Sequence, residues 1–503
     1  MRALLVNPEF LPTYWSYRYV LPFVGKRAVH PPLGLLTVAA LLPPHWRPRL
    51  VDMNVEPLHD RTLRAADVVL LTGMHAQRRS LHDVLRRCRR LGVPTVVGGP
   101  YATTEPDLLA DADHLVLGEA EDTLASFCAD FEAGRAPRTT RNAEWPDVVR
   151  TPIPRYDLLR PGAYYNMSLQ YSRGCPFSCE FCDIIVVYGR RPRTKTASQV
   201  EAELDAIHAT GFRGGVFFVD DNFIGNKKAV RALLPCLRAW QERRGWPFDF
   251  YTEASLNLAD DGPLMSAMRD AGFWSVFLGI ESPEAAALEE TRKGQNLRGD
   301  MIARVHRVLA HGLDVWGGFI VGFDSDGPEI FERQREFIER AGIADAMVGL
   351  LHAIPGTPLA ARLGAAGRLR ETESVDQFGR PNFTPTLPEP VLVGGYRALL
   401  ETLYEPGRYF ERVSALMRRR PPLAVRRGTL GPRTIARAVR AVATQGVLAA
   451  YRREYWRFLG RVWRWDRRRI AEALLRAAAG HHFIEYTRRD AVPRLTDALD
   501  AIG

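Results

Sequence analysis

Short apolar runs rich in β-branched residues alternate with longer amphipathic stretches through the first 120 residues of the chain. The runs have the length of strands, and the stretches between them have the period of helices. The five predicted strands occupy residues 3–7, 49–52, 68–72, 95–99 and 114–117. Because alternating strands and helices form parallel sheets with helices on both faces, we expect an open α/β sheet within residues 1–150. A Pro- and Arg-rich stretch at 136–154 indicates a linker.

A second series of strand-like runs follows this stretch, with amphipathic helices between them. The runs occupy residues 168–171, 215–220, 249–253, 275–280, 315–322 and 347–351. A complete β/α barrel has eight strand-helix steps. Six steps therefore predict a partial barrel over residues 151–370.

The strand pattern stops near residue 370, and helical periodicity predicts a helical unit over residues 371–503. Within it, apolar and basic side chains separate onto two faces of one helix. One face carries Tyr455, Leu459, Val462 and Trp463, and the other carries Arg457, Arg461, Arg464 and Arg468. Such a helix suits an anionic membrane surface, with its arginines at the headgroups and Trp463 and Leu459 in the interface. A packed helix with a solvated arginine face is the alternative.

The composition is typical of a folded protein of several domains, with 46% hydrophobic and 25% charged residues among 503. The apolar run at residues 3–6 is too short for a signal peptide, and no apolar stretch reaches the ~20 residues of a membrane span. We therefore expect a cytoplasmic protein, which the basic helix could attach to the inner face of the membrane. The net charge of +10 gathers after residue 411 without a nucleic-acid-binding motif, so nucleic acid is not an expected partner.

Three of the six cysteines lie close together, in the stretch Cys175-Pro-Phe-Ser-Cys179-Glu-Phe-Cys182 after the first barrel strand. Three thiolates at this spacing can hold three corners of a [4Fe–4S] cluster and leave the fourth iron without a protein ligand. A zinc site would need a fourth Cys or His nearby, and the loop has none. The spacing therefore predicts iron-sulfur ligands.

This cysteine loop on the first strand of a β/α barrel resembles the radical S-adenosylmethionine superfamily from about Tyr165 to Pro358. The resemblance implies that S-adenosylmethionine binds the open iron and is cleaved reductively to a 5′-deoxyadenosyl radical. It also implies an electron donor such as flavodoxin or ferredoxin. No catalytic residue other than the cluster ligands is predicted.

The same resemblance implies further cofactor contacts at the carboxyl ends of the barrel strands. Phe181 would lie near the adenine, Asp220 and Asp221 would bind the methionine ammonium, Glu253, Ser255, Glu281 and Ser282 would bind the methionyl and ribose groups, and Gly318 and Gly322 would let the backbone approach the adenine. A loop-anchoring role for Phe181 and solvated turn positions for the two aspartates are the structural alternatives.

An open α/β domain joined to a radical barrel resembles the cobalamin-binding members of the superfamily. The residues expected to meet cobalamin follow strand ends, where open sheets bind ligands: Thr72, Gly73, Met74, His75, Gly98, Gly99 and Glu119. The Asp-x-His-x-x-Gly pattern of the cobalamin mutases is absent. The resemblance therefore implies a cobalt that His75 does not hold, and His75 could equally cap its loop.

Several stretches resemble the group that contains bacterial hopanoid C-2 methylases: residues 170–175, 189–196, 219–226 and 317–324. The resemblance implies radical C-methylation of an unactivated carbon, for which a polycyclic, hopanoid-like lipid is the candidate substrate among small molecules and lipids. A cyclase, oxidase or carbon-coupling enzyme without methyl transfer is the alternative. A corrinoid-binding protein without turnover is a third reading, against which the complete cysteine triad argues.

Overall fold

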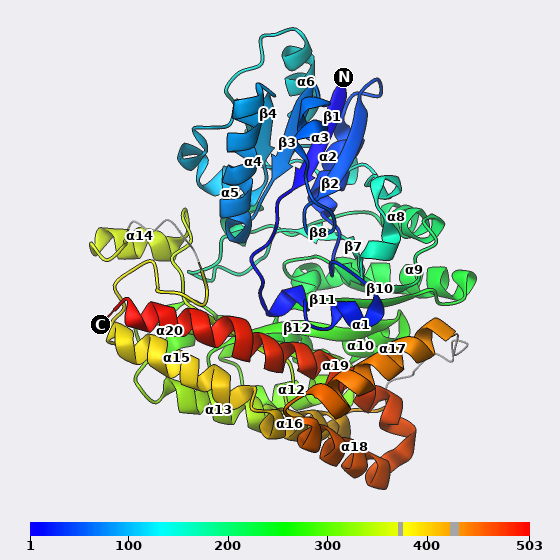
Figure 1. The fold of residues 1–503 in the computed structure, drawn as a ribbon, viewed down its shortest axis with the longest axis vertical. Helices are drawn as coiled ribbons and strands as arrows, with labels where there is room; N and C mark the ends of the chain where they lie inside the picture. The colour runs from blue at the N-terminus through cyan, green and yellow to red at the C-terminus, as the bar shows by residue number, and fades with distance from the viewer. Residues whose placement is uncertain (371–375, 423–431, 503) are drawn as a thin grey trace.

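The computed structural model describes residues 1–370, 376–422 and 432–502. Two six-stranded parallel sheets lie one above the other in Figure 1, and the C-terminal helices lie beside and below the second sheet. This architecture confirms the predicted fold class. It places the carboxyl ends of the second sheet's strands toward the first sheet.

The first sheet has the strand order β2-β1-β3-β4-β5-β6. Its strands are β1 (Arg2–Asn7), β2 (Arg47–Asp52), β3 (Val68–Thr72), β4 (Thr95–Gly98), β5 (His114–Leu117) and β6 (Thr139–Arg141). Successive side chains of a strand point to opposite faces. Leu4 and Val6 accordingly pack in one core with helix α4 (Arg78–Leu91), and Ala3 and Leu5 pack in the other. That second core includes residues of α2 (Leu33–Leu41) and α6 (Leu124–Glu132).

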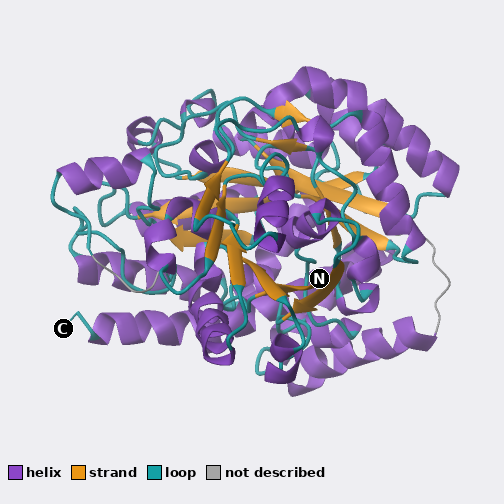
Figure 2. Ribbon diagram, turned by 90° about the horizontal axis from the view of Figure 1, so that it is seen from above, coloured by secondary structure: helices purple, strands orange, loops and turns teal. Residues whose placement is uncertain are grey.

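The second sheet curves into a partial barrel with the order β14-β13-β12-β11-β10-β7. Its strands are β7 (Met167–Leu169), β10 (Gly214–Phe218), β11 (Phe248–Ala254), β12 (Phe273–Glu281), β13 (Asp314–Val321) and β14 (Ala346–Leu350). The helices between and after them are α8 (Ala197–Ala209), α9 (Lys227–Arg244), α10 (Gly262–Asp270), α12 (Met301–Ala310), α13 (Ile330–Ala341) and α14 (Pro358–Ala365). Figure 2 shows the helices around the strands. Each predicted barrel strand is present, with ends that differ by one or two residues.

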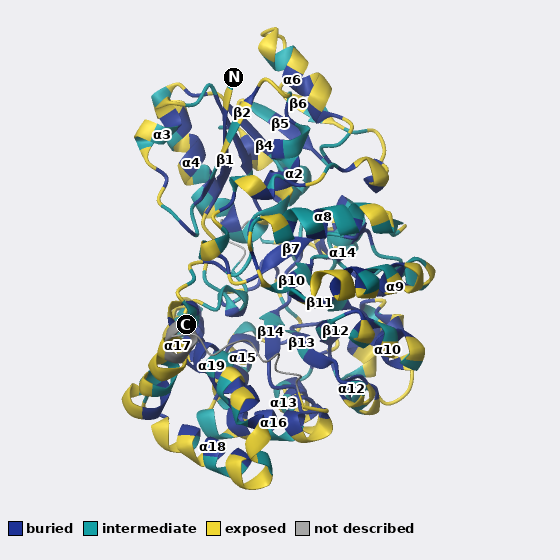
Figure 3. Cartoon of the chain, turned by 90° about the vertical axis from the view of Figure 1, so that its right-hand side faces the viewer, coloured by how far each residue is buried: buried dark blue, intermediate teal, exposed yellow. Residues whose placement is uncertain are grey.

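The helical unit continues the core of the barrel. Its helices are α15 (Glu389–Leu403), α16 (Pro406–Arg419), α17 (Pro432–Ala443), α18 (Arg452–Asp466), α19 (Ile470–Tyr486) and α20 (Val492–Asp500). Their buried side chains belong to the same hydrophobic cluster as the barrel strands. Figure 3 shows the buried faces of α15, α16 and α18 in dark blue and exposed residues at their outer surfaces. No helix among the described residues is both long and apolar enough to cross a bilayer.

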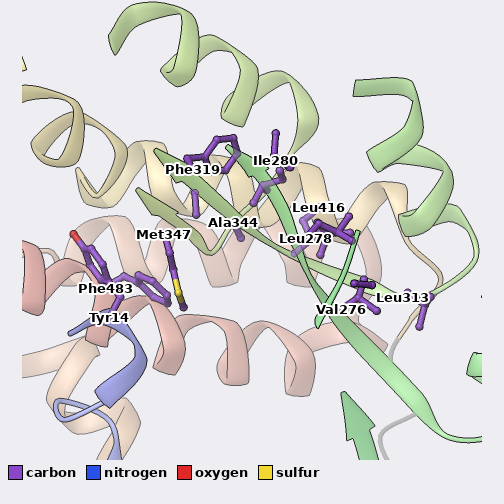
Figure 4. Packing of buried hydrophobic residues seen from close by; sticks show 14 of the residues in the cluster. Tyr14, Val276, Leu278, Ile280, Leu313, Phe319, Ala344, Met347, Leu416 and Phe483 are labelled. Carbon is purple, nitrogen blue, oxygen red and sulfur yellow. The ribbon is translucent and has the colours of Figure 1, made fainter. Parts of the chain in front are cut away.

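The N-terminal segment between β1 and α2 leaves the first sheet and packs on the helical unit. It contains a short 3-10 helix, Tyr14–Ser16, and helix α1 (Leu21–Val24). The Tyr14 hydroxyl lies 2.7 Å from Thr487 Oγ1, and His482 Nε2 lies 2.8 Å from the Tyr14 carbonyl oxygen. Figure 4 shows Tyr14 beside Phe483 and Met347. The first and last parts of the chain therefore share one core.

Helix α18 has the two faces that its sequence predicted, with one correction. Tyr455 and Val462 are buried, and so is Leu459, which is only 8% exposed. Leu459 therefore packs inside the protein and is not available to enter a membrane, whereas Trp463 is 60% exposed. The apolar stripe holds the helix in place, and the tryptophan faces outward.

Candidate active site at the carboxyl ends of the barrel strands

The cysteine loop leaves the barrel between two short paired strands, β8 (Ser172–Arg173) and β9 (Arg193–Thr194). Gly174, just before the first cysteine, has a φ of +91°. A Cβ atom there would lie 2.9 Å from the Gly189 carbonyl oxygen, and the Cys175 N–H donates to that same oxygen at 3.2 Å. The tight turn therefore requires glycine, and it fixes where Cys175 begins the loop.

Two side-chain amides donate to the cysteine sulfurs. Asn222 Nδ2 lies 3.8 Å from Cys175 Sγ, and Gln295 Nε2 lies 3.7 Å from Cys179 Sγ. Burial raises the pKa of Cys182 and of Cys175, so these thiolates need a nearby positive charge to form.

In the described parts of the chain, no group of three or more His, Cys, Asp or Glu side chains is arranged to hold a single metal ion. The three thiols are spread along one loop and receive hydrogen bonds from amide donors, as the sulfurs of an iron-sulfur cluster do. Their chemistry therefore fits a [4Fe–4S] cluster.

Asp220 holds the start of the cysteine loop. Its side chain is fully buried and accepts hydrogen bonds from the Tyr171 N–H at 3.1 Å and from the N–H and hydroxyl of Ser172. Burial raises the pKa of Asp220 to about 6, and these hydrogen bonds oppose the rise. The carboxylate of Asp220 is thus occupied by the loop that carries the cysteines.

Asp221 and Glu253 form an acidic pair that has less hydrogen-bond support than Asp220. Burial and the charge of Asp220 raise the pKa of Asp221 to about 7, and Asp221 Oδ2 has no hydrogen-bond partner among the described residues. Burial and the charges of Asp221 and Asp220 raise the pKa of Glu253 to about 8. A bound cation would favour the ionised carboxylates. The ammonium group of S-adenosylmethionine is such a cation, so the acidic pair fits the predicted ligand.

Glu281 is paired with a lysine that the sequence did not single out. Lys293 Nζ lies 2.5 Å from Glu281 Oε1 and 5.8 Å from the centroid of the Phe181 ring. Burial lowers the pKa of Lys293, but the charges of Glu281 and Cys179 outweigh it and raise the pKa above its ordinary value. Lys293 therefore places a permanent positive charge beside the cysteine loop. The loop that carries Lys293 matches no sequence motif. Only the tertiary fold places this lysine beside the cysteines.

Phe181 lies close to the residues that follow the glycine-bearing fifth strand. Its ring centroid is 6.2 Å from that of Phe323, which follows Gly322, and Ile320 packs in the same cluster. A Cβ atom at Gly318 would lie 2.6 Å from the Phe277 ring, and Gly322 has a φ of +105°. These positions need glycine. Contact of any of these residues with adenine remains a prediction.

The two predicted serines have local hydrogen bonds. Ser255 Oγ lies 2.6 Å from Asn257 Oδ1 and 3.3 Å from Asn222 Oδ1. Ser282 Oγ accepts a hydrogen bond from the Glu284 N–H at 3.2 Å. Both serines lie at the ends of barrel strands, and their contacts with a ligand stay predictions.

The predicted cobalamin residues lie together at the carboxyl edge of the first sheet. Gly99 has a φ of +88°, and a Cβ atom there would lie 2.1 Å from Thr72 Oγ1. Gly98 ends β4, beside Thr72 in register. Met74 is 55% exposed, although most methionines of a folded domain are buried. The strand ends thus offer a glycine-lined edge with an exposed apolar side chain.

His75 has protein groups close to both ring nitrogens. Its Nδ1 lies 2.9 Å from Glu105 Oε2 without hydrogen-bond geometry, and its Nε2 lies 3.1 Å from Thr104 Oγ1 and can form a hydrogen bond with it. The ring is also packed against Tyr101, with centroids 5.5 Å apart. These contacts hold the ring within the first domain, as the loop-capping alternative describes.

Glu119 joins the two sheets. Its carboxylate is paired with Arg173 and, at 2.5 Å, with Arg193, and Glu121 Oε1 lies 2.7 Å from Arg173 Nη2. All four side chains are at most 15% exposed. The sequence predicted a cofactor contact for Glu119 and missed this ion-pair network, because its partners are more than fifty residues away. The cofactor contact stays a prediction.

Three family models match successive parts of the chain. A B12 binding domain matches residues 26–127, the radical SAM superfamily matches residues 169–338, and a domain of unknown function (DUF4070) matches residues 357–492. The first match includes four strands of the first sheet, the second includes most of the partial barrel, and the third includes most of the helical unit.

Two curated relatives and one solved structure are similar over most of the chain. The hopanoid C-2 methylase of Rhodopseudomonas palustris is 34% identical over 97% of this chain and 94% of its own. An uncharacterized methyltransferase of Synechocystis sp. is 45% identical over 82% of this chain and 78% of its own. The radical enzyme OxsB, solved with aqua-cobalamin and S-adenosylmethionine, superposes with a TM-score of 0.61 at 15% identity, covering 99% of this chain and 83% of OxsB.

Proposed function

Because the chain belongs to the cobalamin-binding radical S-adenosylmethionine methyltransferases, alongside the hopanoid C-2 methylase, we propose that it methylates an unactivated carbon of a polycyclic, hopanoid-like lipid. The cofactors of this family are a [4Fe–4S] cluster, S-adenosylmethionine and cobalamin. The similarity to the hopanoid methylase, which includes the helical unit, is the observation that carries the choice of lipid.

When bound, the cluster and cobalamin supply the radical and the methyl group. The residues of this chain would do the positioning. Cys175, Cys179 and Cys182 would hold the cluster, and Asp221 and Glu253 would neutralise the ammonium of S-adenosylmethionine. Lys293 would offset negative charge at the cysteine loop. The barrel wall would keep water from the radical.

The experiment that tests this function uses the full-length enzyme, reconstituted anaerobically with iron, sulfide and cobalamin and reduced by flavodoxin or ferredoxin, the proposed donors. A polycyclic lipid extract is incubated with it and with S-adenosylmethionine that carries a deuterated methyl group. A lipid whose mass rises by one labelled methyl group is the expected product. A lipid that only loses hydrogen would instead identify a cyclase or oxidase.

We also propose that the protein attaches to the inner face of the membrane, where such lipids reside. Two tryptophans of α18 support this location, since Trp456 is 50% and Trp463 is 60% exposed. The side chains of Arg457 and Arg468 are 64% and 88% exposed on the same helical segment. Exposed indole rings and guanidinium groups together suit the interface of an anionic bilayer.

A further inference from the structure

A cavity of about 1290 Å³ opens at the end of the barrel opposite the cysteines. It is lined at the amino-terminal ends of the strands, by Gly214 and Gly215 of β10, Trp274 of β12 and Trp316 of β13. The cysteine loop follows the carboxyl end of β7. The cavity is therefore distinct from the predicted cluster and cobalamin sites, and none of the residues assigned to those cofactors lines it.

Several aromatic side chains line the cavity. The rings of Tyr251 and Trp316 are 5.5 Å apart, those of Trp274 and Trp316 are 5.7 Å apart, and Trp15 of the N-terminal segment lies 6.4 Å from Trp316. Small residues leave room between them, since Gly214, Gly215 and Gly272 line the same space. Flat rings and bare backbone suit a broad, rigid, apolar ligand.

Alternate residues of the barrel strands differ in burial. On β10 and β12, Val216, Phe218, Val276 and Leu278 are 0% exposed and pack in the core of the barrel. The alternate residues Phe217 and Phe277 are only partly buried. Trp274 stands where β11 and β12 shift register, and it lines the cavity, so a ligand there would cover its ring.

The lining also includes polar and charged side chains, among them Asn166, Arg213, Asp249, Arg269, Asp345 and Arg476. Among the described residues, neither Trp316 Nε1 nor His30 Nδ1 has a hydrogen-bond partner, so each could bond one hydroxyl or similar group of a ligand. Burial lowers the pKa of His30 to about 4, so its ring is neutral at physiological pH. Asp345 and Arg476 pair with each other at 3.8 Å.

The mouth of the cavity is formed by the helical unit and combines apolar and basic side chains. Leu475 of α19 is 57% exposed, and Ala478 and Ala479 lie one turn further along the same helix. Lys26 and Arg437 stand at the same opening. An apolar opening with a basic rim suits a lipid that arrives from an anionic bilayer.

The inner end of the cavity approaches the predicted S-adenosylmethionine site. Tyr251 lines the cavity, and Glu253 follows two residues later on the same face of β11. Two residues span about 7 Å along a strand. The Tyr251 ring stacks on Phe217 with centroids 4.8 Å apart, and Phe277 pairs in register with Glu253.

We propose that this cavity is the binding site for the apolar ring system of the substrate, which enters the barrel from its amino-terminal end. This inference rests on the proposed function, because it takes the substrate to be a polycyclic lipid. The cofactors would then act from the carboxyl end of the strands, and the lipid would reach them from the membrane side without passing between the two sheets.

The test is photoaffinity labelling of the full-length, cofactor-loaded protein by a pentacyclic triterpene that carries a diazirine, without reductant. We expect labelled peptides that contain Trp274, Trp316 or residues of α19, and competition by unmodified triterpene. Ala479→Trp, which places an indole in the mouth, should lower this labelling at least ten-fold. Ala471→Trp is the matched control, because Ala471 is exposed on the same helix and does not line the cavity.

Leu475→Asp provides a second test at an exposed position, where a charge at the mouth should also lower labelling without unfolding the protein. Labelling that is absent, is not competed, or is unaffected by both mouth substitutions overturns the inference. Product analysis separates the two proposals. If the wild type and Ala479→Trp methylate the triterpene equally, the cavity assignment fails while the function stands. If the cavity is labelled as expected but no triterpene is methylated, the function fails while the lipid site stands.

Discussion

Asp220 and Asp221 are neighbours in the sequence, yet their carboxyl groups have different surroundings. Asp220 receives three hydrogen bonds from the start of the cysteine loop, whereas Asp221 Oδ2 has no partner. The sequence motif predicted the same ligand for both. The structure favours Asp221 as the group that is available to bind S-adenosylmethionine.

We predict that Asp221→Asn weakens binding of S-adenosylmethionine about ten-fold or more, because it removes a charge that faces the ligand's ammonium group. The visible absorbance of the cluster should remain. Equilibrium dialysis with radiolabelled S-adenosylmethionine measures the change. Cys175→Ala serves as a comparison and should lose the absorbance itself, since three thiolates hold the cluster. Unchanged affinity in Asp221→Asn would remove this aspartate from the site.

The pKa of Glu253, raised to about 8, predicts a pH dependence of the apoprotein. The folded protein keeps a proton on Glu253 that the unfolded chain releases above about pH 4.5, so this group's contribution to stability falls as pH rises to about 8. Glu253→Gln should therefore stabilise the apoprotein by about 1–2 kcal/mol at pH 8.5 and by little below pH 5. Urea unfolding at the two pH values measures the difference. An equal effect at both would contradict the assignment.

We predict that cobalt in the full-length protein has no histidine ligand from His75, because Thr104 lies within hydrogen-bond distance of its Nε2 and the Glu105 carboxylate lies 2.9 Å from its Nδ1. Electron paramagnetic resonance of the Co(II) form should lack nitrogen hyperfine splitting. His75→Ala should leave this spectrum unchanged. Splitting in the wild type that disappears in His75→Ala would show that His75 is the ligand.

The β8–β9 hairpin and the segment after β5 form an element that joins the two sheets. Arg173 and Arg193 of the hairpin meet Glu119 and Glu121, and all four side chains are largely buried. If one of the arginines were removed, a buried carboxylate would be left without a counter-charge. The hairpin also begins the cysteine loop, so the same contact fixes the cluster ligands relative to the first sheet.

We predict that Arg173→Met destabilises this junction by about 3 kcal/mol, the usual cost of removing one partner from a buried ion pair. Cleavage by trypsin at the arginines of residues 135–150 should become faster. The double variant Arg173→Met with Glu119→Gln should recover part of the resistance, because the unpaired charge is removed. If the single variant is cleaved no faster than the wild type, the ion pairs do not hold the junction.

The strands were predictable because buried β-branched runs carry a local signal. Strand β6 was not, since Thr139–Arg141 is a short edge strand with little buried surface, and the sequence indicated a linker there. The contacts of Tyr14 with the last helices also escaped prediction, because they join positions more than 450 residues apart. Within the site, the cysteines and strand-end acids followed motifs. Lys293 and the partners of Glu119 depended on the tertiary fold.

At the scale of the whole molecule, the barrel mouth and the exposed tryptophans belong to the same helical unit. Membrane attachment through this unit would bring the opening of the cavity near lipid. It would leave the first sheet, at the other end of the molecule in Figure 1, away from the bilayer.

We predict that the full-length protein sediments with anionic liposomes at low salt and is released as salt rises, as screened surface charges require. Each arginine near anionic lipid contributes about 1 kcal/mol, so Arg457→Glu with Arg468→Glu should reduce binding by more than ten-fold. Trp463→Ala should weaken binding at all salt concentrations. Leu459 is buried, so it is not substituted in this test. Neutral liposomes are the control. Equal binding to neutral and anionic liposomes would contradict the predicted electrostatic attraction.

The packing of Tyr14 against α19 and the turn that follows it has a consequence for how the protein is made. The segment that supplies Trp15 to the cavity wall is synthesised more than 450 residues before Phe483, Tyr486 and Thr487, which contact Tyr14. Trp15 can pack earlier on Phe277 and Trp316 of the barrel, but Tyr14 has to wait for α19. We therefore expect a ribosome-stalled chain that ends before α19 to lack the proposed lipid cavity even when its cysteine loop is complete.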